Sequence, residues 1–309
     1  MLFRSNREGL SREYAAKPGN NPLLHEETMR NGTTVGIARR WYESGQLRRV
    51  AFHNDKGQSE AVAEFHPDGK LNELRCAARP QLTPHADDAA WCGHQGASGK
   101  VTLFDSKGQA SGSLTHERGE LRYRELLWSN GKPRSQVTTT DKDRTELTFA
   151  QDGIKRRDMQ WVFQGSGGER RAVPSLDREY HESGPLTRER RYSSTDRGAE
   201  LRLEQHWYLN GQPREKIDTV SIDGKPGQRE TRYHDNGQPS FEGAYLRGER
   251  GGRIPTGVHK SFDANGKLRY ERYYNERGRV ARERELDESG VVKRDEELFE
   301  DGSRKAFAR

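Results

Sequence analysis

The chain has 309 residues, of which 30% are hydrophobic and 33% are charged. This balance excludes a thick globular core, whereas five Trp, eleven Tyr and ten Phe spread along the chain argue against disorder. The chain has 54 Lys and Arg residues and 48 Asp and Glu residues, and the two signs are interspersed along the sequence. This pattern indicates a surface of mixed charge and not a nucleic-acid-binding arm. No stretch reaches the ~18 consecutive apolar residues of a transmembrane helix.

Residues 1–28 are expected to form an N-terminal extension. They begin MLFRSNREGL and contain no apolar stretch typical of a secretory signal. Two interpretations remain open: the protein is cytoplasmic, or the sequence is a mature form whose leader was replaced by a methionine.

From residue 29 to residue 309 a glycine recurs at a nearly constant spacing. Within each block the step is 11 to 14 residues, which fits one strand with one turn and is too short for a pair of helices. Many of these glycines follow Ser, Asp or Asn, and such pairs supply the positive φ angles of tight hairpin turns. The sequence therefore predicts an all-β fold, an elongated single-layer antiparallel β-meander built from hairpin repeats.

The last block predicts how the two faces of the sheet differ. Alternate residues from 268 to 274 and from 280 to 286 begin and end with apolar side chains, so we expect them to share one face. The residues between them are largely charged and predict a solvated face. A register that places Arg269 opposite Glu283 would pair opposite charges there.

An aromatic residue or a leucine stands four residues before the main glycine of most repeats. Two roles are open for this stripe: a structural spine, because a single-layer sheet must bury something along its length, or a groove for an aromatic ligand. The stripe residues are Trp41, Phe65, Phe104, Leu127, Phe149, Tyr180, Trp207, Tyr233, Phe262, Tyr274, Leu286 and Leu298.

The run SFEGAYLRGERGGRIPTGVHKSFDANGKLRYERYYNERG, residues 240–278, resembles the variant MORN repeat of YwqK-type antitoxins. Units of that repeat read as E-G-x-Y, a glycine-bearing loop, G-x-x-x-x-aromatic, N-G-K-L and then E. Weaker copies cover most of residues 29–309. The matching positions are Glu242, Gly243, Tyr245, Gly257, Phe262, Asn265, Gly266, Lys267 and Leu268.

The resemblance implies a function as well as a fold. Proteins of this kind are bacterial β-meanders that neutralise a toxin encoded beside them, including immunity proteins against secreted antibacterial effectors. We therefore expect a non-enzymatic antitoxin or immunity protein that occludes a cognate toxin or effector encoded by an adjacent gene, for example an envelope-attacking lipase. The alternative is a MORN-type scaffold associated with a membrane or with the envelope. Because repeat scaffolds are reused for many partners, the resemblance does not identify the toxin.

Three stretches interrupt the period: residues 72–100, 164–178 and 246–257. Insertions in a repeat array lie in loops on its rim, where binding concentrates. The first is the most distinctive of the three. The second is glycine-rich, and we assign it no role.

Both cysteines of the chain, Cys76 and Cys92, lie in the first insertion. Three interpretations are open: a disulfide that closes the loop, two free thiols, or a zinc site completed by His85 and His94, whose spacing matches no standard zinc finger. A disulfide favours an oxidising compartment, so we expect the periplasm, with the cytoplasm as the alternative.

The candidates for partner binding lie in the first and third insertions. Trp91 and His94 are the candidates in the first insertion. In the third insertion Arg247, Arg250 and Arg253 stand among glycines, where they either bind carboxylates of a partner or form a solvated hairpin tip.

Catalytic motifs are not evident in the sequence. The ten histidines are scattered, and neither G-x-S-x-G, H-E-x-x-H nor a phosphate-binding loop occurs. We therefore expect no enzymatic activity, no cofactor, no metal and no nucleic-acid partner.

Overall fold

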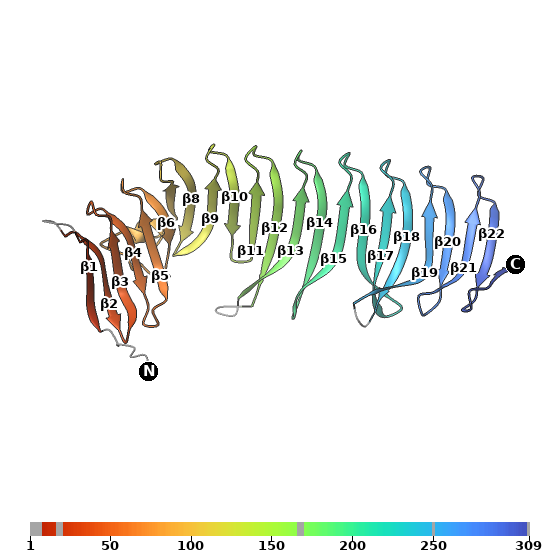
Figure 1. The fold of residues 1–309 in the computed structure, drawn as a ribbon, viewed down its shortest axis with the longest axis horizontal. Coiled ribbons are helices and arrows are strands. Elements are labelled where there is room, and N and C mark those ends of the chain that lie inside the picture. The colour runs from red at the N-terminus through yellow and green to blue at the C-terminus, as the bar shows by residue number, and fades with distance from the viewer. Residues whose placement is uncertain (1–7, 17–20, 166–169, 249–250, 308–309) are drawn as a thin grey trace. The chain divides into compact units, whose positions relative to one another are not determined.

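The structure, a computed structural model, describes residues 8–16, 21–165, 170–248 and 251–307. The chain divides into two compact units, Met1–Gly153 and Ile154–Arg309, which we describe separately. In each unit antiparallel strands follow one another in chain order and are joined by hairpin turns (Figure 1). The predicted all-β antiparallel meander is confirmed.

The first unit contains a six-stranded sheet, β1 to β6, followed by the antiparallel series β7 to β11. One short helix, α1, precedes β7; no helix among the described residues is long and apolar enough to cross a membrane. The elements are β1 (Gly9–Tyr14), β2 (Leu23–Arg30), β3 (Thr33–Trp41), β4 (Leu47–His53), β5 (Ser59–Phe65), β6 (Leu71–Arg75), α1 (Asp88–Trp91), β7 (Gly99–Phe104), β8 (Ala110–Glu117), β9 (Glu120–Leu127), β10 (Pro133–Thr139) and β11 (Asp143–Phe149).

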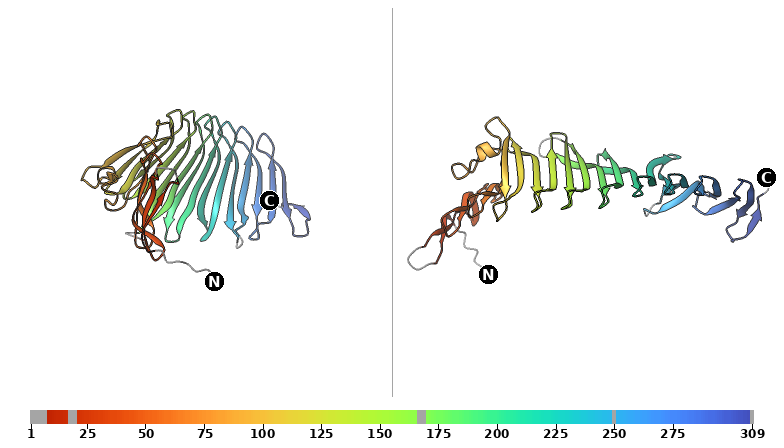
Figure 2. Two further views of the ribbon diagram at one scale, coloured as in Figure 1. Left: turned by 60° about the vertical axis from the view of Figure 1, so that its left-hand side comes forward. Right: turned by 90° about the horizontal axis from the view of Figure 1, so that it is seen from above.

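The second unit continues the same pattern from β12 to β23, each strand pairing antiparallel with the next (Figure 2). Its strands are β12 (Lys155–Gln164), β13 (Arg171–Tyr180), β14 (Leu186–Thr195), β15 (Gly198–Trp207), β16 (Pro213–Ile222), β17 (Lys225–Tyr233), β18 (Pro239–Arg247), β19 (Arg253–Phe262), β20 (Leu268–Tyr274), β21 (Val280–Leu286), β22 (Val292–Leu298) and β23 (Arg304–Ala306).

The segment expected to be an N-terminal extension, residues 1–28, contributes to the sheet. β1 pairs antiparallel with β2, with Gly9 opposite Met29. The glycine spacing begins only at Gly32, so it could not reveal strands that precede it.

The recurring glycine closes a hairpin turn of one type. At the first of these turns the N–H of Gly45 donates to the carbonyl of Tyr42, and the N–H of Tyr42 donates to the carbonyl of Gln46, both at 2.9 Å. Gly45 has a φ of 84°, which an L side chain rarely adopts. The same pair of bonds recurs at the turns that begin with Asn54, His66, Asp105, Trp128, His181, Tyr208, His234, Asp263, Asn275, Asp287 and Phe299.

All of these turns except the one that begins with Phe299 are accompanied by an irregularity in the strand register, which the sequence did not predict. Between β20 and β21, Tyr273 lies opposite Arg282 but the next residue, Tyr274, lies opposite Val280. One extra residue on a strand changes the face on which its neighbours project.

The predicted assignment of faces is therefore wrong in β20. Glu271, expected on the solvated face, is only 7% exposed, whereas Tyr270, expected on the apolar face, is 40% exposed. The predicted register is also wrong: Arg272, not Arg269, lies opposite Glu283. The sequence-based assignment assumed that side chains alternate strictly between the two faces up to the turn. It fails because the register shifts between Tyr273 and Tyr274, directly before the turn.

The stripe residues are at least half-buried, and most of them end their strands at these irregularities. Cationic side chains cover several of their rings; the Arg39 guanidinium lies 5.5 Å from the Trp41 ring centre. The turns are also linked along one edge, since the hydroxyl of Tyr42 donates to the carbonyl of Phe65 at 2.9 Å and Tyr208 donates in the same way to Tyr233. These contacts favour a structural role for the stripe.

A second special glycine occurs in two hairpins. Gly36 in β3 and Gly257 in β19 have φ angles of 69° and 68°, and the pairing with the preceding strand shifts register beside each of them. Beside Gly257 the ring of His259 fills the irregularity, with its Nε2 2.8 Å from the carbonyl oxygen of Ala244. Burial lowers the pKa of His259 and favours its neutral form.

The first unit has an apolar core, to which its first sheet, its insertion and β7 and β8 contribute. Val50 and Ala61 are fully buried in the sheet, Leu82 is fully buried in the insertion, and Leu103 and Leu114 pack against them. This core joins residues 72–100 firmly to the strands on either side of them.

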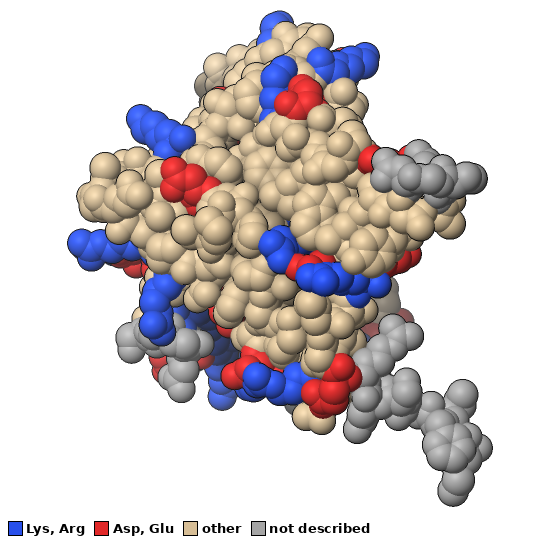
Figure 3. Space-filling model, turned by 90° about the vertical axis from the view of Figure 1, so that its left-hand side faces the viewer, with Lys and Arg blue, Asp and Glu red and all other residues tan. Residues whose placement is uncertain are grey.

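The second unit depends far more on charge. Among its described residues only Val173 and Leu286 are buried hydrophobic residues. One row of directly opposed residues runs across the strands from β12 to β22, and no two neighbours in this row carry the same charge. Its members are Asp158, Arg178, Glu189, Gln205, Lys216, Thr231, Glu242, Lys260, Glu271, Arg284 and Asp295. Such pairs contribute roughly 0.2–1 kcal/mol each. Figure 3 views the molecule from the side on which Figure 1 draws the first unit, and there too Lys and Arg side chains lie beside Asp and Glu side chains.

The second and third predicted insertions are extensions of ordinary hairpins. Residues 164–178 lie mostly in β13, and residues 246–257 span the ends of β18 and β19. Residues 166–169 and 249–250 lie outside the described residues. Only the first insertion, residues 72–100, leaves the strand pattern over a long stretch of the described chain.

Replacing Gly257 with alanine should destabilise the second unit by about 1–2 kcal/mol, because an L side chain is strained at positive φ. A Cβ at Gly257 meets nothing within 4 Å, so the backbone angle is the only cost. Gly252→Ala is the matched control, since its φ is not in the positive range and its Cβ also meets open space. Urea denaturation should separate the two variants; equal stability would contradict the role of this glycine.

Acid should destabilise the second unit through Glu189. Burial opposes ionisation of this carboxyl, but its bonds to Arg178 and Arg191 outweigh burial and lower its pKa below the ordinary value of 4.5. The stabilisation is therefore complete above about pH 4.5 and is lost as the pH falls through the lower folded pKa. Thermal denaturation between pH 7 and pH 3 should show this decline.

Two variants isolate this contribution from the rest of the pH dependence. Glu189→Gln should lower the Tm near neutral pH and flatten the decline below about pH 4.5, whereas Glu182→Gln, at an exposed turn, should leave both unchanged. The histidines whose pKa is lowered by burial take up protons preferentially on unfolding, and this effect is common to all three proteins. If the Tm of wild type and of Glu189→Gln fell equally as the pH is lowered, Glu189 would not be the source of the acid sensitivity.

Candidate functional site

The insertion between β6 and β7 contains a disulfide bond. Cys76 and Cys92 are joined with an S–S distance of 2.00 Å, and Cys92 is 1% exposed. The disulfide interpretation is the one that the structure bears out, so the free-thiol and zinc interpretations do not apply to it. Among the described residues no group of three or more His, Cys, Asp and Glu side chains is placed to hold a metal ion.

A buried carboxylate orders the polypeptide inside the disulfide loop. Asp88 is 1% exposed, and its side chain accepts hydrogen bonds from the backbone N–H groups of Gln81 at 2.6 Å and Leu82 at 2.9 Å. The preceding residue, Asp87, caps the short helix α1 by accepting from the N–H of Ala90 at 3.2 Å. Together with the disulfide and the apolar core, these bonds fix the loop in one conformation.

The two partner-binding candidates of this insertion face inward more than expected. The ring of Trp91 lies 6.3 Å from the ring of Phe65 and packs against the core, so it is half-buried. His94 is also half-buried, and its Nε2 has no hydrogen-bond partner among the described residues. Burial, and then the charge of His94, lower the pKa of His116. Trp91 therefore serves the packing of the loop.

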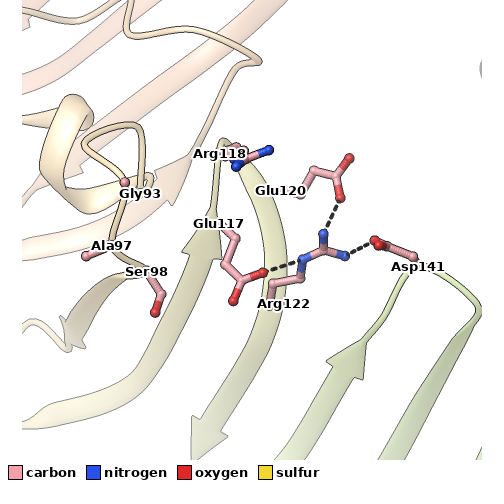
Figure 4. A pocket seen from close by; sticks show the side chains of 9 residues that line it. Gly93, Ala97, Ser98, Glu117, Arg118, Glu120, Arg122 and Asp141 are labelled. Atoms are coloured by element: carbon pink, nitrogen blue, oxygen red, sulfur yellow. Dashed lines mark hydrogen bonds and ion pairs between the residues drawn. The ribbon is translucent and has the colours of Figure 1, made fainter.

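A pocket opens where the insertion meets the turns of the following strands (Figure 4). The guanidinium of Arg122 lines it and contacts three carboxylates: Glu117 at 3.2 Å, Glu120 at 3.1 Å and Asp141 at 2.8 Å. Burial opposes the charge of Arg122, but these contacts outweigh burial and raise its pKa. Arg118 is exposed at the turn between β8 and β9.

The lining of this pocket combines rigid backbone with charged side chains. Its volume is about 740 Å³, and residues Gly93, Gly96, Ala97 and Ser98 of the insertion form one wall. Three carboxylates and two guanidiniums leave an acidic balance, which suits the basic side chain of a partner protein. The sequence did not reveal this site because its acidic residues come from two separate turns, Glu117 and Glu120 from the turn between β8 and β9 and Asp141 from the turn between β10 and β11.

The arginine candidates of the third insertion occupy the end of the hairpin formed by β18 and β19. Arg247 and Arg253 lie directly opposite each other, and Arg250 lies outside the described residues. Arg253 binds the buried carboxylate of Glu230 and stacks 3.8 Å from the ring centre of Tyr245. Sequence reasoning missed Glu230, since nothing in the repeat distinguishes it from other strand residues, and it noted Tyr245 only as a position that matches the repeat.

Comparison with known proteins supports the repeat. A family described as MORN repeat variant matches residues 34–55 and 255–276. The chain carries MORN repeats. Gly36 and Gly257, both at positive φ, occupy the same position in the two matched segments. Each segment therefore corresponds to one hairpin with a glycine irregularity and a glycine turn.

Matches to complete proteins are limited. No curated protein matches the sequence. Solved structures titled "Crystal Structure of TcdB2-TccC3-TEV" and "Crystal Structure of TcdB2-TccC3" align with 96% of this chain at 13% and 12% identity, with TM-scores of 0.15 and 0.14. The chain spans only 18% and 19% of the length of those chains.

Removing the disulfide should destabilise the first unit by about 3 kcal/mol, the value typical of a loop of this length. The expected result is a lower urea midpoint for Cys76→Ala combined with Cys92→Ala. Wild-type protein after reduction is the matched control, and its urea midpoint should equal that of the double variant. Intact mass under non-reducing conditions should fall about two daltons below that of the reduced protein; identical masses would contradict the bridge.

Proposed function

We propose that this chain is a non-enzymatic bacterial protein that binds a cognate toxin or secreted effector and neutralises it by covering its active cleft. The MORN repeats and the resemblance of residues 240–278 to YwqK-type antitoxins support this function. The observation that carries it is the order imposed on residues 72–100 by a disulfide, a buried carboxylate and the apolar core. A loop that is already ordered loses little conformational entropy on binding.

The mechanism relies on shape and charge. The acidic pocket around Arg122 receives a basic side chain of the effector, while the sheet beside it provides a rigid surface that blocks access to the cleft. A disulfide in the binding loop supports a periplasmic location, because disulfides persist in oxidising compartments. An effector that acts on the cell envelope is therefore the expected partner.

Co-expression with the product of an adjacent gene tests the proposal. The adjacent product alone should stop growth, and this chain should restore growth and co-purify with it in a fixed ratio. Glu120→Lys should weaken the complex by about tenfold or more, because it adds a positive charge to the acidic pocket. Glu182→Lys, at an exposed turn of the second unit, is the control and should leave binding unchanged.

Two outcomes would overturn the proposal. The first is that no adjacent product binds the chain or is relieved of toxicity by it. The second is that the chain sediments with vesicles of anionic phospholipid and leaves the co-expressed neighbour toxic, which is the behaviour of a membrane scaffold.

A further inference from the structure

The second unit contains a pocket of about 280 Å³ on its sheet. Five strands, β15 to β19, contribute to it, together with Gly251 and Gly252, which directly precede β19. Tyr245 and Pro226 supply apolar surface, and Arg247 and Arg253, which project on the same face of the sheet as Tyr245, supply charge. This pocket is independent of the one around Arg122 in the first unit.

Arg253 is held in place before any ligand arrives. Its guanidinium contacts the carboxylate of Glu230, which is 1% exposed, and stacks 3.8 Å from the ring centre of Tyr245. Glu230 also binds Arg232. An arginine fixed in this way loses little conformational entropy when it binds an anion.

Arg247 is placed opposite this fixed arginine. The two residues face each other at the last rung of the hairpin, and Arg247 projects on the same side as Tyr245, two residues before it. No ion pair joins Arg247 to another described residue, and its side chain is exposed. Like charges directly opposite each other destabilise a strand pair.

Among the described residues around this pocket, positive charge is in excess. Three guanidiniums, those of Arg232, Arg247 and Arg253, share the carboxylates of Glu230 and of Glu215, which lies 3.6 Å from Arg232. Glu200 also lines the pocket, but Arg202 binds it at 3.1 Å. One anion bound between Arg247 and Arg253 would neutralise this excess positive charge.

We propose that this pocket binds an aspartate or glutamate side chain from an extended segment of the partner protein. Arg247 and Arg253 hold the carboxylate, and apolar residues that flank it in the segment pack against Tyr245 and Pro226. The inference rests on the proposed function, since it names the chemistry of one contact with the neutralised protein.

A labelled pentapeptide with a central glutamate flanked by leucines serves as the probe, with fluorescence anisotropy as the measurement. The full chain should bind it at least about tenfold more tightly than the same peptide with a central glutamine. Arg247→Gln should abolish this preference without lowering the Tm, because it removes a like-charge contact. Arg229→Gln, an exposed arginine of β17 outside the pocket, should retain the preference.

Equal binding of the two peptides to wild type would overturn the inference, as would an unchanged preference in Arg247→Gln. The proposed function is judged separately by growth. If Arg247→Gln still neutralises the adjacent toxin as well as wild type does, the toxin does not bind at this pocket. The proposed neutralising function then still holds. If wild type fails to neutralise any adjacent product, the function fails whatever the peptides show.

Discussion

The turn glycine held at positive φ is the constraint on which the rest of the structure depends. Gly45 and its counterparts reverse the chain in a fixed geometry, and the register irregularity next to most of these turns decides which side chains share a face. Because the same turn recurs along one edge, polar side chains such as those of Tyr42 and Tyr208 reach the backbone of the next turn. The repeat thus sets the spacing, the faces and the links between hairpins together.

A sheet with few apolar residues needs another source of stability, and the two units find different ones. In the first unit, the insertion brings Leu82 and Cys92 against the sheet and creates an apolar core. In the second unit, buried carboxylates such as Glu189 and Glu230 are each bound by two arginines. Removing one partner of such a group leaves an uncompensated charge, which makes these positions more sensitive than their polar character suggests.

The two candidate contact sites have opposite charge balances. The pocket around Arg122 is acidic, whereas the pocket between Arg247 and Arg253 has excess positive charge. Both are built on ordered backbone, through the disulfide loop in one case and through the buried Glu230 in the other. A partner that carries both a basic and an acidic contact would be selected by charge as well as by shape.

The sequence by itself determined the strand and turn periodicity, the antiparallel meander, the MORN resemblance and the segment in which the chain leaves the repeat. These features are local, because a glycine turn and a strand are specified by neighbouring residues. Only the tertiary structure decided which face of β20 buries Glu271, that Trp91 packs inward, and that residues as distant as Glu117 and Asp141 converge on Arg122. These outcomes depend on strand register, and a one-residue irregularity reverses the face without leaving a mark in the local pattern.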